Sequence, residues 1–102
     1  MDKGLGLLRM SFELQISNVG SEVHRAIRYR NSGDERGKIE FCNVAIAFLE
    51  TMKEDPKNVK RIEELDYRIE ELKDYFLGDK SFGTTDEKLI EYYDAYIFDD
   101  IY

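Results

Sequence analysis

Apolar residues in one stretch of this sequence recur at intervals of three and four, and that spacing constrains the fold more than any other feature. The residues in this set are Ile62, Leu65, Ile69, Leu72 and Phe76. Their spacing places all of them along one face of an α-helix. The set covers about two heptads, short of the three or four that would indicate a free coiled coil. We therefore predict a helix that packs inside a bundle.

The outer face of this helix carries charges of opposite sign one turn apart. Lys60 pairs with Glu64 in this pattern, and Glu64 pairs with Arg68. Each such pair stabilises a helix by only ~0.2 to 0.5 kcal/mol. We expect these residues to form a solvated face that adjusts helicity and does not hold the fold together.

Capping side chains and glycines predict where the helices begin and end. Ser32 and Thr84 are each followed three residues later by a glutamate, which fits the capping box. Pro56 follows an aspartate and fits the first position of a helix, where its missing N–H has no helical partner. Gly33 and Gly78 are the predicted ends, because glycine takes the left-handed closing conformation without a Cβ clash.

These signals divide the chain into four helices. The chain has 102 residues, below the ~150 at which a second domain becomes a reasonable expectation, so we predict a single helical domain over 1–102. Its hydrophobic content of 42 % is sufficient for a packed core. The predicted fold is all-α, a compact and mostly antiparallel up-down bundle with helices over about 6–31, 33–54, 56–77 and 85–98.

The first helix has an alternative interpretation as a strand. Residues 8–16 alternate between apolar and polar side chains, the period-two pattern of a half-buried strand. An overlapping set steps by three and four and continues well beyond this segment: Leu5, Leu8, Phe12, Ile16, Val19, Val23 and Ala26. The length of the second pattern favours a helix, since a lone strand would need a partner molecule to satisfy its backbone. An intermolecular strand over 8–16 is the alternative.

The second helix carries more apolar surface than a surface helix needs. Its apolar side chains, Phe41 and Phe48 among them, spread over an arc of roughly 220° at 100° per residue. This helix must therefore contact more than one neighbour. Either it lies at the centre of the bundle, or it covers its own chain with one face and a second copy of the chain with another. The second arrangement is the reason that we expect a homodimer.

The fourth helix has a largely aromatic face that includes Tyr92, Tyr93 and Tyr96. Tyrosine is favoured at interfaces, where one end of the ring is wet. Together with Phe41 and Phe48, these three residues are our candidate interface. The sequence thus favours a protein–protein interaction module that acts as a homodimer, with a protein partner or itself as ligand.

Composition and motifs make other functions less favoured. The chain carries 15 Lys and Arg against 22 Asp and Glu, a net charge of −7 that makes a nucleic-acid partner unlikely. Phosphate loops, dinucleotide fingerprints and nucleophile elbows are absent from the sequence, so we expect no nucleotide-using enzyme. It also lacks His-Glu-x-x-His, and we expect no metal, no cofactor and no catalytic residue.

The single cysteine and the apolar runs bear on location. Cys42 excludes a disulfide within the chain and indicates a reducing compartment, and it should be a buried, inert core thiol. The apolar cluster near the N-terminus is too short for a signal peptide, and no run approaches the ~20 residues of a membrane span. We expect a cytoplasmic protein without membrane association.

Charge is unevenly distributed, and the first helix is the basic element. Residues 1–31 hold five basic and three acidic side chains, whereas 32–102 hold ten and nineteen. One flank of the first helix carries Ser17, Ser21, His24, Arg25 and Arg28, beside the small Gly20. Hydroxyl, imidazole and guanidinium groups could bind an anion or small ligand, or form a hydrolytic site. In the competing interpretation the flank is an ordinary polar face whose arginines pair with the acidic fourth helix.

Overall fold

The computed structural model describes residue 6 and residues 8–101, with side chains described as far as Tyr96. The chain forms α2 (Phe12–Asn31), α3 (Glu35–Lys53), the 3₁₀ segment η1 (Pro56–Arg61), α4 (Ile62–Leu72), the π-helical segment η2 (Lys73–Leu77) and α5 (Asp86–Ile101). The described residues contain no strand. The predicted all-α bundle of four packed helices is therefore confirmed.

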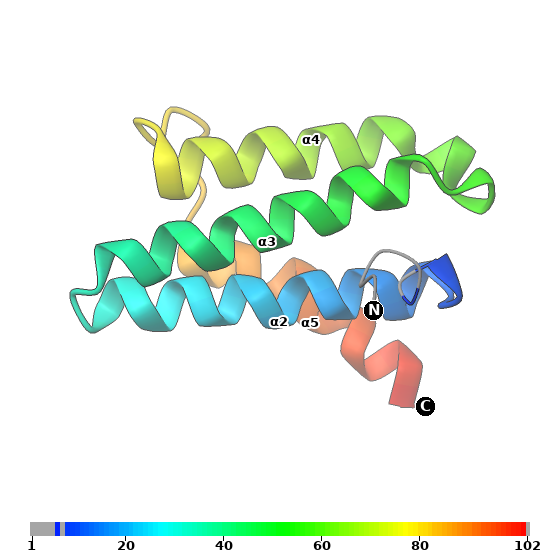
Figure 1. Cartoon of the computed structure of the whole chain (residues 1–102), viewed down its shortest axis with the longest axis horizontal. Helices are drawn as coiled ribbons and strands as arrows, with labels where there is room; N and C mark the ends of the chain where they lie inside the picture. Colours follow the sequence, from blue (N-terminus) through cyan, green and yellow to red (C-terminus); the bar gives the residue numbers. More distant parts are fainter. Residues whose placement is uncertain (1–5, 7, 102) are drawn as a thin grey trace.

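The helices follow one another in up-down order (Figure 1). α2 packs against α3 on one side and α5 on the other, and α4 packs against the far side of α3. The packing order is thus α5, α2, α3, α4. The remaining side, between α4 and α5, lacks extensive backbone contact, and this seam is where side chains make the contact between helices.

The helix predicted over 6–31 is interrupted before Phe12. α2 starts at Phe12, because the Ser11 side chain caps it by accepting a hydrogen bond from the Leu14 N–H at 3.1 Å. Residues 6 and 8 are helical, but residues 9–11 are not, so the predicted continuous helix over 6–31 is wrong at that interruption. Residues 12–16 are helical, so the strand alternative is also wrong there.

The turn between α2 and α3 uses different capping residues from those predicted. Ser32 closes α2, with its hydroxyl donating to the Tyr29 carbonyl at 2.9 Å. Asp34 caps α3 by accepting from the Gly37 N–H at 2.8 Å, so the predicted box at Ser32 is wrong. Gly33 has φ +82°, which confirms the predicted helix end at this glycine.

The predicted helix over 56–77 consists of three segments of different pitch. Its start is confirmed, since Asp55 accepts from the Lys57 N–H at 3.1 Å and Pro56 is the first helical residue. Its end is at Gly78 as predicted, but the predicted left-handed closure is wrong, because Gly78 has φ −115°. Instead the chain turns on Asp74, whose carboxylate accepts from the Phe82 N–H at 3.0 Å and the Ser81 N–H at 2.8 Å.

The start of α5 also differs by one residue from the predicted cap. The Thr85 hydroxyl, and not that of Thr84, accepts from the Lys88 N–H at 3.2 Å. Thr84 instead donates to the Glu71 carboxylate at 2.8 Å. Its side chain therefore joins the loop before α5 to α4.

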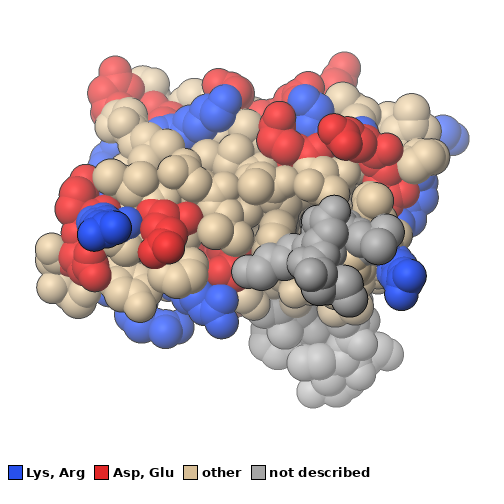
Figure 2. Space-filling model, viewed as in Figure 1, with Lys and Arg blue, Asp and Glu red and all other residues tan. Residues whose placement is uncertain are grey.

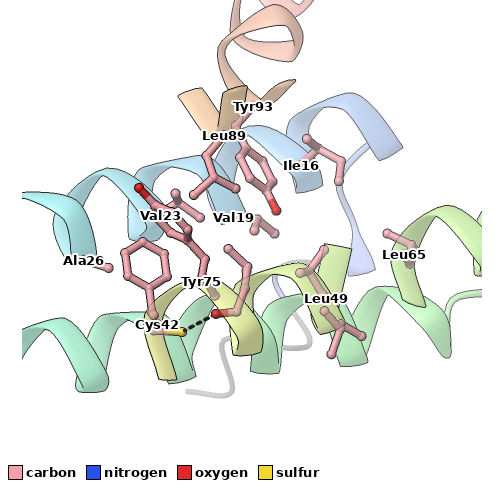
Figure 3. Close-up of a cluster of buried hydrophobic side chains, with 14 of the residues drawn as sticks. Ile16, Val19, Val23, Ala26, Cys42, Leu49, Leu65, Tyr75, Leu89 and Tyr93 are labelled. Atoms are coloured by element: carbon pink, nitrogen blue, oxygen red, sulfur yellow. Dashed lines mark hydrogen bonds between the residues drawn. The ribbon is translucent and has the colours of Figure 1, made fainter. Parts of the chain in front are cut away.

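All four helices contribute to one hydrophobic core (Figure 3). The apolar seam of the 56–77 segment is confirmed, with its buried members being Leu65, Ile69, Leu72 and Phe76. The three–four pattern of α2 is confirmed over Phe12, Ile16, Val19, Val23 and Ala26. α3 buries Cys42, Ala45, Leu49 and Met52 between α2 and α4. The wide arc of α3 thus meets two neighbours within its own chain.

Gly20 allows α2 and α5 to approach closely. A Cβ atom on Gly20 would lie 2.8 Å from the Cβ of Tyr93, closer than real Cβ contacts. Tyr93 is fully buried at this crossing. The position of α5 therefore depends on the missing side chain at residue 20.

Candidate functional site

A groove of about 600 Å³ lies along the seam between α4 and α5. Its lining residues are Tyr67, Arg68 and Glu71 from α4, and Lys88, Glu91, Tyr92, Ala95 and Tyr96 from α5. Pockets of this size and aromatic content are common at ligand and partner sites. We refer to it as the seam groove.

A polar stripe on α4 and its flanking segments forms one side of this seam. It consists of Arg61, Glu64, Arg68, Glu71 and Tyr75, which step by 3, 4, 3 and 4. Each member directly precedes one member of the apolar seam, so the two stripes run side by side along the helix. Every member contacts α5, its preceding loop or both.

This stripe corrects the predicted surface charge pairs. Glu64 pairs with Arg61 at 3.0 Å, and not with Lys60 or Arg68. Arg68 pairs with Glu71 at 2.8 Å. The charges are directed into the seam because the tyrosines of α5 provide hydroxyl and ring partners there.

Rings and guanidinium groups form a continuous ladder along the seam. The Arg68 guanidinium lies between two rings, with its carbon 3.8 Å from the Tyr92 centroid and 4.9 Å from that of Tyr67. Tyr67 packs against Phe82 at 5.6 Å, and Tyr92 against Tyr96 at 5.4 Å. Such cation–π contacts stabilise by about 0.5 to 2 kcal/mol each, depending on desolvation.

The ladder continues at the end of the seam near the start of α2. The Tyr96 ring meets Phe12 edge-on at 5.8 Å. The guanidinium carbon of Arg61 lies 3.7 Å from the Phe12 centroid. We use the term aromatic ladder for the whole series: Phe82, Tyr67, Arg68, Tyr92, Tyr96, Phe12 and Arg61.

Two carboxylates, Glu64 and Glu71, bind the arginines of the ladder. Glu64 accepts hydrogen bonds from Tyr92, from Tyr96 at 3.4 Å and from Arg61 at 3.0 Å. Burial acts to raise the pKa of Glu64, but these donors outweigh it and leave the pKa below its usual range. Burial raises the pKa of Tyr92, and its bond to Glu64 raises it further. Glu64 is therefore ionised and Tyr92 protonated at neutral pH, so neither is poised for proton transfer.

Two buried polar atoms on α4 and α5 have no hydrogen-bond partner among the described residues. They are the Nε of Arg68 and the hydroxyl of Tyr93. An unpaired buried polar group costs roughly 1 to 3 kcal/mol. The second carboxylate, Glu71, is buried and satisfied by Arg68 and Thr84.

The five predicted ligand-binding residues lie elsewhere, along the outer flank of α2, and none of them lines the seam groove. The Ser21 hydroxyl donates to the Ser17 carbonyl at 3.4 Å within the helix. Arg25 pairs with Glu22 on the same helix at 2.9 Å. Arg28 is exposed and forms no ion pair with the described residues.

His24 is held by a neighbouring helix. Its Nε2 lies 2.8 Å from Asp94 Oδ1 of α5, and both side chains are partly exposed. Further along α2, Arg30 binds Asp86 at the start of α5. The first and fourth predicted helices thus pair through polar side chains, although the residues that do so are His24 and Arg30.

The predicted interface residues fall into three environments. Phe41 is half-buried and stacks on Tyr29 at 5.2 Å, and Phe48 is half-buried against the core. Tyr92 and Tyr96 line the seam groove. Tyr93 belongs to the core of the single chain.

Sequence reasoning did not assign Tyr67, Arg68 or Glu71 to a functional site. The signal was present, because the polar residues directly preceding the apolar seam repeat with the same spacing. Pairing that stripe with the tyrosines of α5 required the position of α5 in space.

Comparisons with protein-family models, with curated proteins and with solved structures find no match to this chain. Within the described part of the chain, no helix has the length and apolar content needed to cross a membrane. The described side chains also include no cluster of His, Cys, Asp or Glu that could hold a metal ion. The functional interpretation therefore depends on the geometry of the seam groove.

Proposed function

We propose that this chain is a small protein-interaction module that binds a partner protein in the seam groove. The observation that carries this proposal is the aromatic ladder, in which tyrosines and arginines gather along one groove. Tyr and Arg are enriched among the few residues that dominate interface energies. Two members of the ladder remain open to solvent, with Tyr67 at 50 % and Phe82 at 42 % exposure.

The contacts of the ladder are also already formed within the single chain. Its rings contact one another, and its charged members are already paired with Glu64 and Glu71. A preformed site loses less side-chain freedom on binding, which favours affinity. Pairing between the two helices is polar and aromatic, so the groove presents both ring faces and hydrogen-bonding groups.

Selection from a displayed random-peptide library tests this proposal. The wild-type protein should enrich a defined set of peptides. Tyr67→Ala and Phe82→Ala should each weaken their binding, by roughly 30-fold if each residue contributes about 2 kcal/mol. Val59→Ala is the matched control, because Val59 is 66 % exposed and belongs neither to the groove lining nor to the aromatic ladder. Failure to enrich any sequence, or equal binding by all three variants, would overturn the proposal.

We also propose that the module acts as a homodimer, through the face formed by α2 and α3. Figure 2 shows charged atoms gathered toward the edges of this face and largely uncharged surface between them. The uncharged residues of α2 and α3 that are exposed or half-buried include Ser17, Ser21, Asn43, Ala47 and Phe48. An uncharged face in a chain with 36 % charged residues favours self-association, since fewer charges must be desolvated.

Light scattering after size exclusion tests the dimer. The wild-type mass at micromolar concentration should be that of two chains. Ala47→Glu places a charge on the proposed contact and should give the mass of one chain, whereas Val59→Glu on η1 should leave the mass unchanged. A wild-type mass of one chain at every concentration would remove the homodimer while leaving the seam groove proposal in place.

The alternative of an anion or small-ligand site, or a hydrolytic site, at His24 and Arg28 has less support. His24 is already bonded to Asp94, and Arg25 to Glu22. If this flank binds an anion, Arg28→Ala should abolish binding of inorganic phosphate without changing the melting temperature. If Arg28→Ala has no effect on such binding, the flank is a polar face.

A further inference from the structure

We propose that the segment which binds in the seam groove is a basic one, and that an arginine side chain of the partner packs on the exposed part of the Tyr67 ring. This inference rests on the proposed function and specifies the partner's chemistry. Three observations support it: the charge of the two helices that border the groove, the arrangement of the chain's own arginines, and the residues open at the groove edge.

The two segments that border the groove carry a more negative net charge than the chain as a whole. Residues 62–77 carry six acidic and two basic side chains, and residues 86–101 carry six and one, which gives a charge of −9. The chain as a whole has −7, so the remainder carries +2. A field of this sign attracts a cationic partner and repels nucleic acid and anionic lipid.

The chain's own arginines show how a guanidinium is accommodated in this seam. Arg68 lies against the rings of Tyr67 and Tyr92 and donates to Glu71 at 2.8 Å. Arg61 repeats the arrangement, with Phe12 as the ring and Glu64 as the carboxylate. A planar guanidinium can stack on a ring and bond to a carboxylate at once, which an ammonium group does less well.

The same two components are open at the edge of the groove. Tyr67 is half exposed, and its hydroxyl makes no hydrogen bond with the described residues. Glu91 is exposed on the facing wall and forms no ion pair with the described residues. A ring and a carboxylate without an ion pair among the described residues therefore face the solvent in the groove lining. Lys88 on the same wall opposes a cationic ligand.

The test uses three peptides that differ in one side chain. The probe is an acetylated peptide of alternating arginine and alanine, compared with versions in which citrulline or lysine replaces arginine. Citrulline keeps the planar shape and removes the charge, whereas lysine keeps the charge and removes the plane. Calorimetry should give the tightest binding for arginine, weaker binding for lysine, and at least ~10-fold weaker binding for citrulline. Amide shifts in NMR spectra should concentrate around Tyr67 and Glu91.

Charge-matched variants separate a specific site from general attraction. Glu91→Gln should weaken binding of the arginine peptide several-fold, and Lys88→Gln should strengthen it. Glu40→Gln is the control, because it removes the same charge from an exposed position of α3 outside the groove. Equal effects of Glu91→Gln and Glu40→Gln, or equal affinity for citrulline and arginine, would overturn the inference.

The outcome also separates this inference from the proposed function. If displayed peptides bind the groove and lose affinity with Tyr67→Ala but carry no basic residues, the interaction module stands and the basic partner does not. If no peptide binds the groove, both proposals fail.

Discussion

At the scale of single residues, one buried polar group of the core has a hydrogen-bond partner and another has none among the described residues. The Cys42 thiol is fully buried and lies 3.7 Å from the Leu72 carbonyl (Figure 3). The Tyr93 hydroxyl is equally buried but has no partner among the described residues. Burial in this core therefore predicts how reactive the Cys42 thiol is, and how the Tyr93 hydroxyl affects the stability of the protein.

Cys42 should be unreactive while the protein is folded. Burial raises the pKa of its thiol to about 12, so almost no thiolate is present at neutral pH. A thiol-reactive dye should modify the native protein far more slowly than the unfolded protein in guanidinium chloride. Equal rates in the two states would show that Cys42 is accessible.

Tyr93→Phe should stabilise the protein or leave its stability unchanged. The substitution removes a buried hydroxyl that is unpaired among the described residues and keeps the ring that fills the core. We expect the free energy of unfolding in urea to rise by up to about 1 kcal/mol. Tyr92→Phe is the control, since it removes a bond to Glu64 and should lower stability. A loss of stability in Tyr93→Phe would indicate a partner for this hydroxyl.

At the scale of elements, each helix has one face for the core and one for a neighbour. α4 carries its apolar seam and its polar stripe side by side, so a single helix packs against α3 and contacts α5 by different chemistry. α2 contacts α5 through Gly20, where the backbones come close. The position of α5 therefore depends on a small residue on one side and on polar contacts on the other.

Gly20→Ala should displace α5. The added Cβ would clash with that of Tyr93 at 2.8 Å, and overpacking of this kind costs typically about 1 to 3 kcal/mol. Thermal unfolding should show a lower melting temperature for this variant. Ser21→Ala is the matched control, because Ser21 is exposed and alanine is the better helix former. An unchanged melting temperature in Gly20→Ala would mean that the two helices can separate without cost.

At the scale of the whole molecule, polar contacts join α5 to α2 on one side and to α4 and η2 on the other. Asp86, at the start of α5, accepts from Arg30 of α2 and from Tyr75 of η2. The bond from Arg30 holds the pKa of Asp86 below its usual range. Asp86 thus ties three segments that are distant in sequence.

Acid should destabilise the protein through Asp86. Because its pKa is lower in the folded state, its contribution is fully present above the ordinary carboxyl value of ~4 and is lost as the pH falls through the lowered folded pKa. Wild type should therefore lose unfolding free energy below about pH 4. Asp86→Asn should be less stable at neutral pH and lose less on acidification. Parallel pH profiles for the two proteins would show that Asp86 makes no such contribution.

The sequence by itself determined the helical fold, because the spacing of apolar residues in α2 and α4 is a local property of the chain. It also determined the starts and ends that depend on adjacent residues, such as Asp55 with Pro56 and the turn at Gly33. It misplaced caps where several neighbouring residues could serve, as at Ser32 and Asp34. Choosing between such neighbours depends on the direction in which the chain leaves the preceding helix.

Only the tertiary structure decided which polar residues meet. Glu64 and Arg68 read as solvated charges in the sequence. They enter the seam together with Arg61 and Glu71, because α5 brings tyrosines against them. His24 likewise finds Asp94, 70 residues away in the chain. Pairing over such distances depends on how the helices pack, since a periodic pattern specifies the face of a helix but not the neighbour that covers it.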